Sequence, residues 1–240
     1  MAAQGVVFAT PHIPGLSYFP EFLSEEELDL LSAVIEAGPR DASETLSTGR
    51  PLAATPGVHW HGFPRPHGWD RSCGDTTEES PLPRLVVGAL ARLQQRGALP
   101  EGYAFDQAIV NCYPEGAEGI PMHVDRATFD DVIVGFSLGA PAVIDFEPLD
   151  ARKAVDLREV GLSSGTPLSL VLEERSVYIF SGEVRWQWKH GIRQGPHRYN
   201  GVELPGGQRI SVTLRRMKRQ ERRSEPGDPD TLWLEESRAE

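Results

Sequence analysis

The chain has 240 residues, a formal net charge of −11 at pH 7 and 39% hydrophobic residues. This length fits one large domain, and the apolar fraction excludes a wholly disordered chain. Its two cysteines, Cys73 and Cys112, exclude a disulfide framework and a cysteine-based zinc site. The acidic balance argues against non-specific wrapping of nucleic acid, although a local basic patch is still compatible with it.

The amino-terminal residues lack a basic stretch of the kind that precedes a secretory signal, and no apolar run reaches the roughly 20 residues of a membrane span. We therefore expect an intracellular protein, in the cytoplasm and/or the nucleus, with no membrane contact. We also expect a monomer.

The first predicted helix begins at Ser24. Ser24 and Glu27 have the spacing of a capping box, in which each side chain accepts a hydrogen bond from the other residue's backbone amide. Apolar residues then recur at helical spacing, namely Leu28, Leu31, Val34 and Ile35. Gly38 and Pro39 are expected to end this helix.

Two loops rich in proline and glycine, 38–57 and 62–83, flank one short predicted strand, 58–61. Loops of this length in a compact domain are often lids or binding loops. On the strand, Trp60 and His61 are candidates to contact a substrate beneath such a lid, with packing against the rest of the domain as the alternative. A second helix is expected over 85–99.

From residue 105 the pattern changes to short, β-branched segments separated by turn residues. The expected strands are 107–113, 132–138, 142–146, 168–172, 176–180 and 209–215. Such spacing is typical of a sandwich or barrel, so the predicted fold class is mainly β (α+β), with an α/β extension at the amino terminus. Residues 221–240 are charged and predict a flexible tail.

His123 and Asp125 are separated by one residue at the end of a predicted strand, so both side chains can bind one metal ion. His190 is the preferred third ligand, because the alternative, His197, follows Gly195 and Pro196 in a loop. Two histidines and one carboxylate, with the remaining positions open, are typical of non-haem Fe(II) oxygenases. A surface turn is the alternative interpretation of His123 and Asp125.

The predicted strand 209–215 alternates polar and apolar residues. Its polar face carries Arg209, Ser211, Thr213 and Arg215. Buried arginines need an anion, and a guanidinium group matches a carboxylate in a bidentate way, so a dicarboxylate would satisfy them. A solvated surface is the alternative for both arginines.

These motifs occur in a fixed order that resembles the AlkB family of Fe(II)/2-oxoglutarate dioxygenases. The ordered motifs are Asn111-x-Tyr113, His123-x-Asp125, His190-Gly-Ile and Arg209-x-Ser-x-Thr-x-Arg215. The resemblance runs from about residue 22 to residue 215. Within the family, 119–146 and 182–190 look most like the oxygenase domain of the homologue that hydroxylates a modified wobble uridine in tRNA.

The resemblance implies a double-stranded β-helix, a jelly-roll-like core, over 105–216. This core, together with an amino-terminal extension over 1–104 that forms a substrate lid, would make one domain over 1–220. It also implies that His123, Asp125 and His190 hold Fe(II), with 2-oxoglutarate and O2 as the other reactants. Arg209 would pair with the distal carboxylate of 2-oxoglutarate. The rest of that pocket would comprise Asn111, Tyr113, Ser211, Thr213 and Arg215.

The expected activity is oxidative dealkylation or hydroxylation of a modified base in RNA, tRNA or DNA, with release of succinate and CO2. DNA repair and RNA modification are both compatible with it. Arg185 is expected at the mouth of the site, where it would contact substrate, with a solvated surface position as the alternative. The same iron enzyme acting on a protein side chain or a small molecule is a second hypothesis, favoured by the acidic charge. A catalytically inactive binding module is a third.

Overall fold

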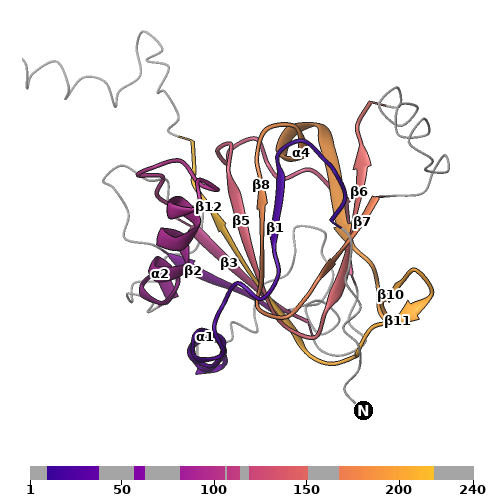
Figure 1. Cartoon of the computed structure of the whole chain (residues 1–240), viewed down its shortest axis with the longest axis horizontal. Helices are drawn as coiled ribbons and strands as arrows, with labels where there is room; N and C mark the ends of the chain where they lie inside the picture. Colours follow the sequence, from indigo (N-terminus) through magenta and orange to yellow (C-terminus); the bar gives the residue numbers. More distant parts are fainter. Residues whose placement is uncertain are drawn as a thin grey trace, which may run out of the picture.

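The computed structural model describes residues 10–37, 57–62, 82–105, 107–113, 119–150 and 168–218. Two antiparallel sheets pack against each other, and two helices lie on the outer side of the larger sheet (Figure 1). The larger, major sheet has the order β1-β8-β5-β12-β3-β2. Its strands are β1 (Leu16–Phe19), β8 (Ser176–Phe180), β5 (Ile133–Gly139), β12 (Arg209–Arg215), β3 (Gln107–Tyr113) and β2 (Gly57–Gly62).

The smaller, minor sheet has the order β4-β9-β6-β7. Its strands are β4 (Ile120–His123), β9 (Trp188–Ile192), β6 (Ala142–Pro148) and β7 (Leu168–Leu172). The short helix α4 (Gly182–Gln187) follows β8 and leads directly into β9, so it joins the two sheets. A separate two-stranded ribbon consists of β10 (Arg198–Tyr199) and β11 (Val202–Glu203).

Helices α1 (Glu25–Ala37) and α2 (Leu82–Gln95) pack their apolar faces against the outer side of the major sheet. The capping box at the start of α1 is confirmed, because Glu27 N donates to Ser24 Oγ at 3.1 Å and Ser24 N donates to Glu27 Oε2 at 2.9 Å. Arg92 of α2 forms a two-pronged ion pair with Glu27, with both N–O distances at 2.8 Å. This pair links the two helices.

Helix α2 begins and ends earlier than the sequence predicts. Its carboxyl end is a Schellman motif, in which Ala98 N donates to Leu93 O and Gly97 N donates to Gln94 O, both at 2.9 Å. Gly97 has a φ of 68°, which is accessible to glycine without strain. The amino-terminal extension is also more than a lid, since β1 and β2 are the two edge strands of the major sheet.

Strand β12 lies in the middle of the major sheet, paired with β3 on one side and β5 on the other. Its apolar residues, Ile210, Val212 and Leu214, face the helices. The alternating polar residues therefore face the minor sheet, where a second apolar cluster from both sheets fills most of the space between them. The functional site occupies the remaining space.

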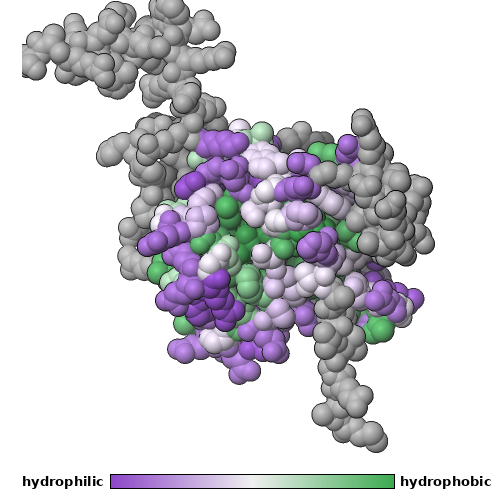
Figure 2. Space-filling model, turned by 45° about the horizontal axis from the view of Figure 1, so that its top comes forward, coloured by the Kyte–Doolittle hydropathy of each residue, from purple (hydrophilic) through white to green (hydrophobic). Residues whose placement is uncertain are grey.

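Figure 2 shows hydrophilic residues over much of the described surface on one face, with hydrophobic residues visible in small areas between them. The exposed large hydrophobic residues lie on separate elements and are Leu30, Val87, Met122, Leu149 and Val202. Among the described residues, no helix has the length and hydropathy needed to span a bilayer.

Candidate metal centre and cosubstrate pocket

Three predicted metal ligands meet between the two sheets. His123 at the end of β4 is paired in register with His190 of β9, and the two ring centroids are 4.5 Å apart. Asp125 follows two residues after His123. One potential ligand atom from each of these three residues lies within 4.8 Å of the other two. His123 and His190, which are 67 positions apart in the sequence, therefore converge because β4 and β9 are neighbours.

The donor atoms of this triad fit Fe(II). His123 Nδ1 lies 2.9 Å from Pro121 O, which can only accept a hydrogen bond, so Nδ1 carries the hydrogen and Nε2 has the free lone pair. Burial lowers the pKa of His190 to about 4, so this ring is neutral at pH 7. Its Nε2 lies 3.5 Å from Asp125 Oδ2. Two imidazoles and a carboxylate are a ligand set that suits non-haem Fe(II).

Asp125 also has a cationic partner. Arg215 Nη2 donates to Asp125 Oδ1 at 2.6 Å, and the Arg215 guanidinium lies over the Phe129 ring, 4.6 Å from its centroid. The other carboxylate oxygen of Asp125, Oδ2, therefore stays available to face the two histidines. Arg215, predicted to bind the cosubstrate, lines the pocket that contains the triad, and its buried Nε has no hydrogen-bond partner among the described residues.

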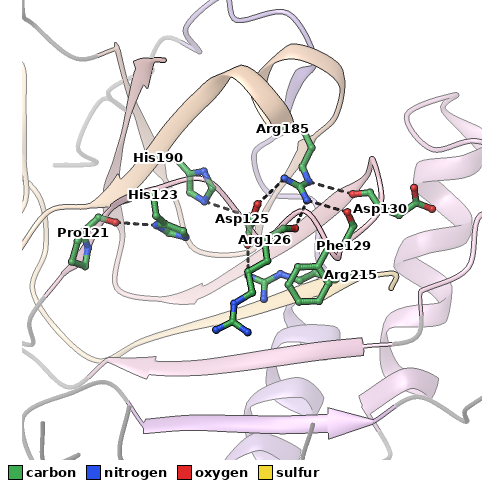
Figure 3. Close-up of polar contacts among 9 residues, drawn as sticks. All are labelled: Pro121, His123, Asp125, Arg126, Phe129, Asp130, Arg185, His190 and Arg215. Carbon is green, nitrogen blue, oxygen red and sulfur yellow. Dashed lines mark hydrogen bonds and ion pairs between the residues drawn. The ribbon is translucent and has the colours of Figure 1, made fainter. Parts of the chain in front are cut away.

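The prediction that Arg185 lies at the mouth of the site is wrong. Its side chain is buried, with the residue 2% exposed, and Figure 3 shows its guanidinium directed at the loop that follows Asp125. It donates hydrogen bonds to the backbone carbonyls of Asp125, Arg126, Phe129 and Asp130, at 2.8 to 3.2 Å. The backbone of the 125–130 loop forms only a turn and one isolated β-bridge, between Phe129 and Met217, so this cation helps to fix its course.

The pocket extends from the triad along β12 and β3. The sequence-predicted residues that line it are Asn111, Tyr113, His123, Asp125, His190, Arg209, Ser211, Thr213 and Arg215. Arg209 is 5% exposed, and its guanidinium lies 5.1 Å from the centroid of the Tyr113 ring. Its Nε and Nη1 atoms are buried and have no hydrogen-bond partner among the described residues. A buried cation with free donors fits a carboxylate ligand.

The apolar wall of the pocket was not predicted. It is formed by Ile120, Ile133, Ile144, Tyr178, Phe180 and Ile192. Alternation along 133–139 and 176–180 would place Ile133, Tyr178 and Phe180 on one face of the major sheet, but the sequence does not indicate which face meets the metal ligands.

Two of the predicted substrate residues, Trp60 and His61, belong to β2. The side chains of Trp60 and His61 lie outside the described part of the structure, although their strand β2 is paired with β3, with Trp60 opposite Ile109 and His61 opposite Ala108. The long loops expected to form the lid also lie largely outside the described residues. His197, the alternative third ligand, instead accepts a hydrogen bond through Nδ1 from Val143 N at 3.4 Å.

The fold and this site together define a non-haem iron oxygenase. The chain belongs to the 2OG-Fe(II) oxygenase superfamily, whose model matches residues 15–215. The protein is therefore an oxidoreductase that uses Fe(II), 2-oxoglutarate and O2.

Relatives in sequence are AlkB homologues, which confirms the predicted resemblance. The "Alkylated DNA repair protein ALKBH8 homolog" of Arabidopsis thaliana is 30% identical over 220 residues, covering 86% of this chain and 59% of its own length. The "Probable RNA/DNA demethylase ALKBH6" of Danio rerio is 26% identical, covering 84% and 85%. The "tRNA (carboxymethyluridine(34)-5-O)-methyltransferase alkbh8" of Xenopus tropicalis is 33% identical over 132 residues, which are 55% of this chain but only 18% of the frog protein.

Solved structures confirm the predicted fold class. The structure of OsALKBH1 matches with a TM-score of 0.54 at 19% identity, covering 86% of this chain and 100% of that one. A prolyl hydroxylase from Trichoplax adhaerens matches with a TM-score of 0.50 at 13% identity, covering 84% and 83%. At these identities the likeness concerns the double-stranded β-helix fold alone.

Proposed function

We propose that His123, Asp125 and His190 bind the Fe(II), that Arg209 binds the distal carboxylate of 2-oxoglutarate, and that the enzyme oxidises a modified base in nucleic acid. One observation carries the assignment of residues. Three metal-binding groups converge in the same pocket as a buried guanidinium that has two free donor atoms.

The protein residues have separable tasks in this proposal. Fe(II), when bound with 2-oxoglutarate and O2, supplies the oxidation of a substrate C–H bond to C–OH, with conversion of 2-oxoglutarate to succinate and CO2. Arg209 orients the cosubstrate from its distal end. Arg215 holds Asp125 through one carboxylate oxygen, so that the other faces His190. The apolar wall limits access of water to the pocket.

The nucleic-acid substrate is inferred from what the relatives' names state. These name a tRNA modification, repair of alkylated DNA and RNA/DNA demethylation. If the oxidised carbon is an N-methyl group, its hydroxylated form releases formaldehyde and restores the base. If it is a side-chain carbon, the hydroxyl stays. Since the chain carries −11 overall, phosphate contacts must be local. Arg126 is exposed and directly follows Asp125, so it is a candidate for such a contact.

Anaerobic titration tests the residue assignment. Apoprotein is titrated with Fe(II) and 2-oxoglutarate, and the visible charge-transfer absorbance of the chelate is recorded. Wild type should give the band, Asp125→Ala should lose it, and Arg209→Ala should need at least about tenfold more 2-oxoglutarate, because a charge-assisted hydrogen bond is lost. Asp131→Ala is the matched control, since Asp131 is exposed and does not line the pocket. Retention of the band in Asp125→Ala would contradict the ligand assignment.

Product analysis tests the substrate. Single-stranded RNA and DNA oligonucleotides with and without a methylated base are incubated with the loaded enzyme, and succinate, formaldehyde and oligonucleotide mass are measured. Turnover should depend on the modified base, and binding should weaken with salt and in Arg126→Glu. Succinate formation stimulated by a peptide or small molecule, but by no oligonucleotide, would favour the second hypothesis.

A further inference from the structure

Tyr178 of β8 lies across a gap in the inner face of the major sheet. The gap is left by the missing side chain of Gly135 on β5. Gly135 is paired with Tyr178 on one side and with Thr213 of β12 on the other. A Cβ atom on Gly135 would lie 2.0 Å from Tyr178 Cζ and 2.4 Å from its hydroxyl oxygen. The end of the phenol therefore occupies the space that a side chain at position 135 would fill, and glycine is required there.

This position places the phenol at the triad side of the cosubstrate pocket. Tyr178 and Thr213 both line the pocket. The Tyr178 ring centroid is 4.7 Å from that of Phe180, and Phe180 is 4.9 Å from the His190 ring. Arg209 lies four residues from Thr213 along β12, or roughly 13 Å at the usual rise of a strand. The phenol thus faces the end of the pocket opposite to the one that Arg209 anchors.

Among the described residues no group hydrogen-bonds the Tyr178 hydroxyl, and its oxygen is not one of the fully enclosed atoms that lack a partner, so it is open to the pocket although the residue is only 7% exposed. The neighbouring Tyr18, paired with Tyr178 on β1, differs in this respect, because its hydroxyl donates to Glu173 Oε2 at 3.2 Å. Buried phenol hydroxyls are usually hydrogen-bonded. The hydroxyl of Tyr178 opens onto the pocket instead, so it can donate to a molecule that is bound there.

The geometry points to Tyr178 as a further cosubstrate-binding residue, whose hydroxyl donates a hydrogen bond to the 2-oxo-acid end of 2-oxoglutarate. This inference rests on the proposed function of the pocket. Arg209 and Tyr178 then bind opposite ends of one extended molecule. Gly135 is needed for this arrangement, because its lack of a side chain leaves room for the Tyr178 ring over β5. A role in packing alone would need the ring but not the hydroxyl.

The test compares 2-oxoglutarate affinity in Fe(II)-loaded wild type and Tyr178→Phe, by anaerobic titration of the visible absorbance. Phenylalanine keeps the ring and removes only the hydroxyl. We expect the dissociation constant to rise about tenfold, since the acceptor is charged, and the melting temperature of the apoprotein to stay unchanged. Tyr18→Phe is the matched control and should leave the dissociation constant unchanged, because its hydroxyl is bonded to Glu173.

A second ligand locates the contact. With 2-oxobutyrate, which lacks the distal carboxylate, the penalty of Tyr178→Phe should persist, whereas that of Arg209→Ala should disappear. Loss of the Tyr178→Phe penalty with this ligand would overturn the proposed position. Equal affinity of wild type and Tyr178→Phe for 2-oxoglutarate would overturn the inference and leave the proposed function standing. Failure of wild type itself to bind 2-oxoglutarate would overturn both.

Discussion

Arg215 Nη2 donates a hydrogen bond to Asp125 Oδ1 at 2.6 Å, with the two side chains 15% and 6% exposed. The charge of the proposed metal ligand is therefore compensated before any metal binds. Removing one member of a buried pair leaves the other charge uncompensated, which costs about 3–5 kcal/mol in the free energy of unfolding. A bound divalent cation would supply the missing positive charge.

Arg215→Met should therefore destabilise the metal-free protein by about 3 kcal/mol, and clearly less when Mn(II) is bound. Urea unfolding in EDTA and in Mn(II) measures both values. Arg92→Met is the control, because Arg92 pairs with Glu27 on the helices outside the major sheet, away from the triad, so its cost should be the same in both conditions. An Arg215→Met cost that is independent of metal would contradict the compensation of Asp125 by the metal.

Arg185→Met should weaken both folding and metal binding. Methionine fills part of the buried space but leaves four backbone carbonyls of the 125–130 loop without the guanidinium donor. We expect a loss of about 3 kcal/mol in the free energy of unfolding and an increase of about tenfold in the Mn(II) dissociation constant, because the loop carries Asp125. Urea unfolding and calorimetric titration measure these two quantities. Arg126→Met, at an exposed position in the same loop, should change neither quantity appreciably.

Gly191→Ala should separate the two histidine-bearing strands. A Cβ on Gly191 would lie 2.7 Å from Ile120 O and 2.8 Å from Met122 Sδ, so β4 must move away from β9. We expect a loss of about 1–3 kcal/mol in stability and weaker Mn(II) binding. Gly88→Ala in α2 is the control, since its nearest neighbours are at 3.8 and 3.9 Å, and it should gain about 0.5–1 kcal/mol without changing metal binding. Unchanged metal affinity in Gly191→Ala would show that the strands tolerate the methyl group.

The Glu27–Arg92 pair should contribute to the free energy of unfolding in a way that depends on pH. Hydrogen bonds from Arg92 hold the pKa of Glu27 below its usual 4.5. The stabilisation is therefore complete above pH 4.5 and is lost as the pH falls through the lower pKa of the folded state. Glu27→Gln should cost about 1 kcal/mol at pH 7, because the pair is partly exposed, and the difference from wild type should shrink below pH 4.5. Thermal unfolding from pH 7 to pH 3 measures it, and a constant difference would contradict it.

Much of the fold was predictable because alternation is strong in the buried strands. The bounds of β3, β7, β8 and β12 agree with the sequence predictions. Strand β1 was missed because all four of its residues are half-buried, which leaves no contrast between its faces. No bounds were predicted for strand β9, because Lys189, His190 and Gly191 have no pattern typical of a strand. Pairing with β4 and β6 imposes its extended form.

Some residues of the candidate site could also be predicted from the sequence, and others could not. His123 and Asp125 are close in sequence, and strand 209–215 displays its polar face, so local patterns indicated both. The role of Arg185 had no local signal, because its acceptors are backbone carbonyls up to 60 residues away. Tyr178 could not be assigned to the pocket because it depends on Gly135 in another strand. The intracellular location, the monomeric state and the domain boundaries remain predictions.

The central place of β12 has a consequence for biosynthesis. This strand is the last of the major sheet to be made, yet it lies between β5 and β3. Until residue 215 has left the ribosome, β3 and β5 each present an unpaired edge, and the nascent chain has no anion-binding wall. Insertion of β12 between β3 and β5 is a late event that forms contacts between residues far apart in the sequence, and such events favour slow folding. The unpaired edges of β3 and β5 also make the incomplete chain prone to aggregate. A chain interrupted before β12 would therefore be a folding failure rather than an oxygenase with a weaker cosubstrate site.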